Sequence, residues 1–179
     1  MKRLSVVFLV IILVLTGCST PLPDLDNIKE SYSSILSMPY AQLIGKNLEE
    51  TSDKTGNLTF NEKENRYYSD KTIMEFTPYF VTNDDGLIKI CGFKTEKENN
   101  EEIVSYIRGL YNICCALYGS VSIDSDIVKR VNSIDDFSKC KDGESYDETW
   151  AKDGFPIEYN VLFESGKAII TIQYNKMPK

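Results

Sequence analysis

The sequence predicts an α+β fold in which an antiparallel sheet, built from two hairpins, has helices packed on one face. Two pairs of β-rich segments are each joined by a four-residue turn, NDDG at 83–86 and ESGK at 164–167. A wide apolar stripe recurs every three or four residues through 99–119, as in a helix that packs on a sheet. The 179 residues are enough for one domain with a buried core.

The chain begins with a segment typical of an export signal. Lys2 and Arg3 precede an apolar run, Leu4–Leu15, that only Ser5 interrupts. At about 1.5 Å per residue the run covers roughly 18 Å, well short of a hydrocarbon core about 30 Å thick. We therefore expect a cleaved signal peptide, with a transmembrane anchor and an ordinary secretory signal as the alternatives.

The end of this segment, Leu15-Thr16-Gly17-Cys18, resembles the lipobox of bacterial lipoprotein signal peptides. The resemblance implies that Cys18 carries a diacylglycerol through a thioether, that cleavage follows Gly17, and that the new amino terminus is often acylated, for example with palmitate. The thiolate is the nucleophile that can accept the lipid. Because a buried acyl chain contributes about 0.8 kcal/mol per CH₂, two or more chains hold a protein stably on a membrane.

The sequence predicts three segments: a signal peptide at 1–17, a lipidated cysteine with a tether at 18–26, and a single α+β domain at 27–179. The tether, STPLPDLD after Cys18, contains two prolines and no apolar periodicity. The expected location is the extracytoplasmic face of the cell membrane, or of the outer membrane if the bacterium is Gram-negative. The protein would be attached there by the lipid on Cys18.

The first half of the domain predicts two helices followed by strands. One helix is expected at 27–38, where apolar residues share a side before Pro39. A second is expected from Asn47, which can cap its first turn, to Gly56. A weak strand is predicted at Leu58–Phe60 and a hairpin at Thr72–Val81 and Leu87–Thr95, with Pro78 placing part of the first strand at an edge or bulge.

The second half predicts the same order of elements. A helix of about 20 residues is expected from Asn99 to Gly119, then short helical turns in 124–139 and a polar loop at 141–146. Strict alternation of apolar and polar residues predicts strands at 157–164 and 168–174. Because helix, loop and hairpin then occur twice, a divergent tandem duplication is one interpretation of the domain.

The second half also resembles small uncharacterised lipoproteins of Gram-positive bacteria, through Leu117-Tyr118-Gly119, Trp150 and the final hairpin. The tandem arrangement is similar to small inhibitor and assembly-lipoprotein folds, in which helices pack on one face of an antiparallel sheet. Neither resemblance includes a specific motif, so neither implies functional residues.

Composition excludes several classes of function. Removing 1–17 takes away Lys2 and Arg3, which leaves 18 basic and 27 acidic residues in the mature chain, a net charge of −9. That balance argues against nucleic-acid binding and against a polybasic membrane-binding patch. Histidine is absent, which excludes histidine bases, Ser-His-Asp triads and His-containing metal sites. No cofactor is expected.

Four cysteines follow Cys18, namely Cys91, Cys114, Cys115 and Cys140. An exported protein with an even number of cysteines is compatible with disulfides that join Cys91 to one of the neighbours Cys114 and Cys115, and Cys140 to the other. The alternative is that Cys91, on a predicted strand, and Cys114, on the apolar stripe, are buried thiols. No metal site is expected: a Cys-x-x-Cys clip for zinc is missing, and the Asp-Gly pairs lack the spacing of a calcium loop.

The aromatic residues are the remaining candidates for contacts. The chain has 11 tyrosines and eight phenylalanines, and four of the tyrosines are expected in the core: Tyr111, Tyr118, Tyr159 and Tyr174. Three aromatic residues lie among polar residues and are the better candidates for exposed contacts: Tyr67, Tyr68 and Trp150.

The expected function is a non-catalytic binding module, anchored to the membrane, with a protein or cell-wall partner. The alternative is a carboxylate-based hydrolase of the cell envelope; no catalytic residue is assigned. A solute receptor ranks lower still, because such receptors usually need two domains.

Overall fold

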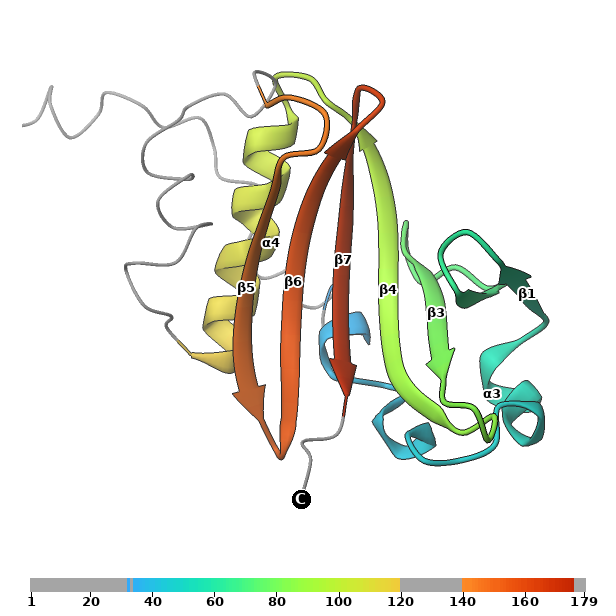
Figure 1. The fold of residues 1–179 in the computed structure, drawn as a ribbon. Helices are drawn as coiled ribbons and strands as arrows, with labels where there is room; N and C mark the ends of the chain where they lie inside the picture. The colour runs from blue at the N-terminus through green and yellow to red at the C-terminus, as the bar shows by residue number, and fades with distance from the viewer. Residues whose placement is uncertain (1–31, 33, 120–139, 176–179) are drawn as a thin grey trace, which may run out of the picture. The chain divides into compact units, whose positions relative to one another are not determined.

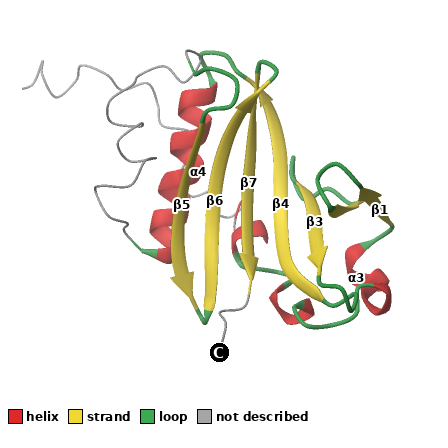
Figure 2. Ribbon diagram, viewed as in Figure 1, coloured by secondary structure: helices red, strands yellow, loops and turns green. Residues whose placement is uncertain are grey.

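The computed structural model describes residues 32, 34–119 and 140–175. These residues form an α+β fold with one antiparallel sheet, as the sequence predicts (Figures 1 and 2). The seven strands are β1 (Leu58–Asn61), β2 (Arg66–Ser69), β3 (Thr77–Thr82), β4 (Ile88–Glu98), β5 (Ser145–Lys152), β6 (Phe155–Glu164) and β7 (Lys167–Asn175). The helices are α3 (Ser52–Thr55) and α4 (Ile103–Tyr118), with 3-10 turns at Ala41–Leu43 and Glu49–Thr51.

The order of strands across the sheet is β1-β2-β3-β4-β7-β6-β5. The strands before α4 therefore form one side of the sheet and the strands after it form the other. The two sides meet where β4 pairs antiparallel with β7, in a ladder that runs from Ile90 opposite Asn175 to Glu98 opposite Lys167. Long strands at the centre hold the two halves together.

Strict alternation of apolar residues places one face of β6 and β7 in the core. On β6 the buried residues are Ile157, Tyr159, Val161 and Phe163, and on β7 they are Ala168, Ile170, Ile172 and Tyr174. The strand predictions for these segments are confirmed, and so is the turn between them. Burying a side chain of this size contributes about 1.5–3 kcal/mol, so this face is a main source of stability.

Helix α4 begins at Ile103, ends at Gly119 and contacts this buried face. The Tyr159 hydroxyl donates a hydrogen bond to the carbonyl oxygen of Ile107, at 3.3 Å. At the other end of the helix the Trp150 indole Nε1 donates to the carbonyl oxygen of Gly119, at 2.9 Å. In Figure 1, α4 lies behind the strands. The helix predicted from the apolar stripe is confirmed, although it is shorter than 99–119.

The segment before β1 also packs on the sheet. The backbone N–H of Tyr40 donates to the Tyr174 hydroxyl at 2.9 Å, and the Tyr40 ring lies 5.3 Å from that of Phe80. Residues 32 and 34–36 are helical, whereas most of the helix predicted at 27–38 lies outside the described residues. The short helical turns expected in 124–139 lie outside them as well.

Two strands that the sequence did not predict extend the sheet beyond two hairpins. Strand β2 pairs with β1 and β3, and β5 pairs with β6 over its whole length. The polar loop predicted at 141–146 is therefore wrong from Ser145 onward. Pro78 lies on a part of β3 that is an edge, as predicted: the β2 ladder ends at Tyr79, so the missing N–H of Pro78 costs no hydrogen bond there. The irregularity in β3 falls between Val81 and Thr82.

Candidate functional site

The candidate site lies on the face of the sheet opposite α4, which we call the open face. The side chains of this face alternate with the buried ones along each strand. Those on the second half of the sheet are mostly polar: Thr149 and Asp147 on β5, Glu158 and Asn160 on β6, and Thr171 and Gln173 on β7. Such a surface offers hydrogen-bond donors and acceptors rather than an apolar patch.

A stack of three residues forms the centre of the open face. Tyr79 on β3 is completely buried although its side chain lies on this face. Its ring lies across Gly92 on β4, so close that a Cβ atom at Gly92 would be 2.3 Å from Tyr79 Cζ. The Arg66 guanidinium lies over the ring, 4.4 Å from its centroid. Because Gly92 has no side chain, the ring can lie flat on the sheet and carry a cation on its outer side.

A chain of hydrogen bonds continues from the stack across the central strands. The Tyr79 hydroxyl donates to Gln173 Oε1 at 2.6 Å, and Gln173 Nε2 donates to Glu158 Oε2 at 2.5 Å. Since the tyrosine hydroxyl uses the oxygen of the amide, the amide nitrogen faces the carboxylate. Side chains from β3, β7 and β6 are thereby held in one arrangement.

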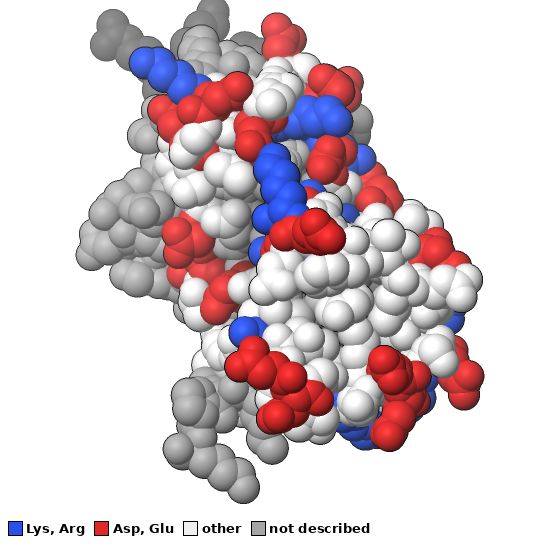
Figure 3. Space-filling view, turned by 45° about the vertical axis from the view of Figure 1, so that its right-hand side comes forward, with Lys and Arg blue, Asp and Glu red and all other residues white. Residues whose placement is uncertain are grey.

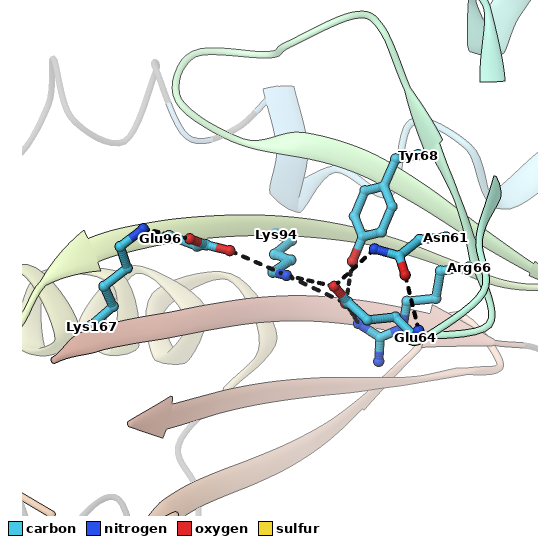
Figure 4. Close-up of polar contacts among 7 residues, drawn as sticks. All are labelled: Asn61, Glu64, Arg66, Tyr68, Lys94, Glu96 and Lys167. Carbon is cyan, nitrogen blue, oxygen red and sulfur yellow. Dashed lines mark hydrogen bonds and ion pairs between the residues drawn. The ribbon is translucent and has the colours of Figure 1, made fainter. Parts of the chain in front are cut away.

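Glu64, in the β1–β2 turn, gathers the donors beside Arg66 (Figure 4). Its carboxylate accepts hydrogen bonds from the Tyr68 hydroxyl at 2.6 Å and from Lys94 Nζ at 3.1 Å. The nearest contact of Arg66 with this carboxylate is longer, at 3.9 Å. The carboxylate is therefore committed mainly to Tyr68 and Lys94, and it ties the β1–β2 turn to the sheet.

These contacts shift the pKa values of the cluster in opposite directions. Burial alone would raise the pKa of Glu64, but the hydrogen bonds from Tyr68 and Lys94 and the charges of Lys94 and Arg66 outweigh it and lower this pKa. Burial, followed by the hydrogen bond to Glu64, raises the pKa of Tyr68 above its usual value of 10.0. At neutral pH the pair is an ionised carboxylate with a neutral phenol.

Lys94 is also paired on its other side. Its ammonium lies 3.3 Å from Glu96, and Glu96 accepts a hydrogen bond from Lys167 on β7 at 3.1 Å. The hydrogen bond from Lys167 is the largest cause of the lowered pKa of Glu96. Figure 4 shows this alternation of charges from Glu64 to Lys167. Lys94 is thus paired with two carboxylates, whereas among the described residues Arg66 forms one ion pair, the 3.9 Å contact with Glu64.

Two hollows in the open face meet at Arg66. One, of about 270 Å³, lies toward Lys63, Leu162 and Ile169. The other, of about 430 Å³, extends to Asp147 and Glu158 on the far strands. Figure 3 shows basic side chains in a line along a hollow, with acidic side chains on either side. Volumes of this size suit a small ligand.

The structure places the residues predicted from the sequence in different surroundings. Cys18 lies outside the described residues. Cys91, Cys114, Cys115 and Cys140 are free thiols, of which only Cys115 is partly exposed. Cys91 and Cys114 are thus buried thiols, as the alternative predicted. Burial raises the pKa of Cys91 to about 12 and that of Cys114 further.

The aromatic candidates differ in how exposed they are. The prediction that Trp150 is an exposed contact is wrong, because only 5% of it is exposed and its ring packs near those of Tyr111 and Tyr118. Tyr67 and Tyr68 are partly exposed, as predicted. Tyr68 belongs to the site through Glu64, whereas the Tyr67 ring packs at 4.7 Å from Phe60.

Sequence reasoning missed Arg66, Tyr79 and Gly92. The signal available was Gly92 inside a β-rich run, since a glycine in a strand often marks the close approach of another group.

The Asp-Gly pairs are turns, as in Asn83–Gly86, where Asn83 Oδ1 accepts hydrogen bonds from two backbone N–H groups. Within the described ranges, no group of three or more Cys, Asp or Glu side chains is arranged to hold a metal ion.

Comparison with known proteins found no match among family models, curated proteins or solved structures. In the part of the chain that the structure describes, every helix is too short or too polar to cross a membrane.

Proposed function

We propose that the protein is a lipoprotein held on the extracytoplasmic face of a bacterial membrane by a diacylglycerol on Cys18. The support is the basic, apolar and small-residue order of Met1–Gly17 followed by cysteine. In this proposal 1–17 is removed and 18–26 links the lipid to the domain. The lipid attaches the protein, which leaves the domain free to bind something else.

We propose further that the domain is a binding module and that its ligand occupies the open face. The observation that carries this proposal is the Gly92-Tyr79-Arg66 stack. It holds a long, charged side chain rigidly above two hollows, although a surface arginine normally gains little from a fixed position. Groups that recognise a ligand bind more tightly when they are already ordered, because less conformational entropy is lost.

The geometry favours binding over the carboxylate-based hydrolase. A glycoside hydrolase of this type needs one carboxyl group with a raised pKa, which can act as the acid. The open-face carboxyls with a shifted pKa, Glu64 and Glu96, are shifted downward by their basic and hydroxyl partners. Both are ionised at neutral pH and neither can supply a proton.

We also propose that the domain is a divergent tandem, in which each half contributes helical residues and strands to one sheet, with the helices on one face. The strand order β2-β3-β4-β7-β6-β5 supports it. If β2, β3 and β4 are exchanged with β5, β6 and β7, the same order results, read from the other edge of the sheet. In such an arrangement the two hollows lie where the open faces of the two halves adjoin.

Mass spectrometry of the protein purified from a bacterial membrane tests the anchoring. The amino-terminal peptide should begin at Cys18 and carry the mass of a diacylglycerol, and a Cys18→Ser variant should keep an uncleaved terminus. A wild-type peptide that begins at Met1, or an unmodified Cys18, contradicts the proposal.

Site-specific crosslinking on intact cells tests the binding face. A photoreactive amino acid at Thr171, on the open face, should capture a defined partner. The same amino acid at Arg108, exposed on α4, is the matched control and should not capture it. Equal recovery at the two positions would contradict a binding role for the open face.

A further inference from the structure

The larger of the two hollows that meet at Arg66 has opposite charges at its two sides. Arg66 lines one side, and Asp147 and Glu158 line the other. Between them lie neutral residues that can both donate and accept hydrogen bonds, Asn160 and Thr171 among them. A ligand that fills this hollow needs a negative end, a positive end and polar groups in the middle.

We propose that this hollow binds a short peptide with free termini, whose carboxylate pairs with Arg66 and whose ammonium group pairs with Asp147 and Glu158. The inference rests on the proposed binding role of the open face and names the ligand class. A guanidinium matches a carboxylate through two parallel hydrogen bonds, and Arg66, held with its Cζ 4.4 Å from the centroid of the Tyr79 ring, lines this hollow.

The spacing of the strands sets the length of the peptide. Arg66 lies above Tyr79, whose ring covers Gly92 on β4, while Glu158 and Asp147 belong to β6 and β5. Neighbouring strands are about 4.8 Å apart, so β6 is roughly 10 Å and β5 roughly 14 Å from β4. An extended chain spans about 3.4 Å per residue and an ion pair takes up about 2.8 Å at each end, which corresponds to a peptide of about two or three residues.

Two other ligand classes fit less well. A phosphate group carries more negative charge than Arg66 can balance, because Lys94 is already paired with Glu64 and Glu96 and further carboxylates line the hollow. A sugar needs an exposed aromatic ring to pack against. The Tyr79 ring is covered by Arg66, and the Lys94 ammonium lies over the ring of Tyr68 at 5.6 Å.

Equilibrium dialysis with a synthetic library of tripeptides, Xaa-Ala-Xaa, tests the proposal. The full-length lipidated protein in nonionic detergent is dialysed against the library with free termini, and against the same library acetylated at one end and amidated at the other. Mass spectrometry should find at least tenfold more retention of the free peptides, a difference that corresponds to about 1.4 kcal/mol. Equal retention of both libraries, or retention of neither at millimolar concentration, overturns the proposal.

Variants identify the two ends of the site. Arg66→Ala should abolish retention and Arg66→Lys should weaken it, because lysine keeps the charge but loses the fork. Asp147→Asn should reduce retention of free peptides, and it should leave unchanged the weaker retention of a third library that is acetylated at the amino end but keeps its free carboxylate. Arg108→Ala, which removes the same side chain from α4, should retain as much as the wild type. If Arg66→Ala retains as much too, the proposal fails.

Crosslinking at Thr171 separates this inference from the proposed function. If Thr171 captures a cellular partner while no free tripeptide is retained, the open face binds something other than short peptides. The binding role then stands and the ligand class is wrong. If neither experiment detects a ligand at the open face, both proposals fall together.

Discussion

Replacing Gly92 with alanine should destabilise the protein through a collision with Tyr79. The new Cβ would lie 2.3 Å from Tyr79 Cζ and 2.5 Å from its hydroxyl oxygen, so the ring must move. Overpacking of this kind costs about 1–3 kcal/mol, and loss of the hydrogen bond to Gln173 adds about 0.5–1.5 kcal/mol. Alanine restricts the unfolded chain, which offsets about 0.4–1 kcal/mol. The expected net loss is about 2 kcal/mol.

Thermal unfolding of the full chain in nonionic detergent measures this loss. For a protein of this size about 1 kcal/mol shifts Tm by roughly 2–4 °C, so Gly92→Ala should lower Tm by about 4–8 °C. Gly109→Ala is the matched control, because a Cβ there meets nothing within 4 Å and alanine favours the helix. In a Tyr79→Leu background Gly92→Ala should cost almost nothing. An undiminished loss in that background would refute the collision as its cause.

Three further predictions concern the ionisable and buried groups. Glu64→Gln should reduce the free energy of unfolding at pH 7. The difference from wild type should shrink as pH falls below about 4.5, because the lowered pKa of Glu64 supplies stability above its unfolded value that protonation removes; urea titrations at pH 7 and 3 measure it. Cys91 and Cys114 should resist a thiol reagent at pH 8 in the folded protein, and unfolding should expose four thiols if Cys18 carries lipid, five if it does not. Trp150→Phe should cost about 1 kcal/mol, because the carbonyl oxygen of Gly119 loses its donor; an unchanged urea midpoint would contradict this.

The strands that sequence could predict are those with one fully apolar face. Val161 and Ile170, for example, belong to strict alternations that survive through whole strands. Strand β5 lacks such a signal because Glu148 occupies an inward position beside Trp150, and the outward residues are all polar or small. An edge strand buries less of its surface, so its composition is less constrained.

The candidate site was beyond prediction for a different reason. Arg66, Tyr79 and Gly92 come from three strands, and only the register of the sheet brings them together. Even with the strands predicted, a shift of one residue between β3 and β4 would move Tyr79 to the opposite face. The register between β2 and β3, which brings Arg66 to Tyr79, was undetermined from the sequence because β2 was not predicted at all.

The same register explains why the open face has a buried residue at its centre. Tyr79 lies between two other buried residues, Pro78 and Phe80, so β3 is covered on both sides at this point. On the open side the cover is Arg66, which is itself about one quarter exposed. The side chain proposed to hold a ligand therefore also shields a tyrosine ring from water.

This double role constrains how Arg66 can be tested and how the site can change. Arg66→Ala uncovers Tyr79 and removes a cation–π contact worth about 0.5–2 kcal/mol, so stability should fall together with binding. Arg66→Lys keeps a long aliphatic stem over the ring and a positive charge, but cannot form two parallel hydrogen bonds. If binding falls in Arg66→Lys while Tm stays near that of the wild type, the fork of Arg66 acts on the ligand. A parallel fall in both quantities would mean that Arg66 serves the fold alone.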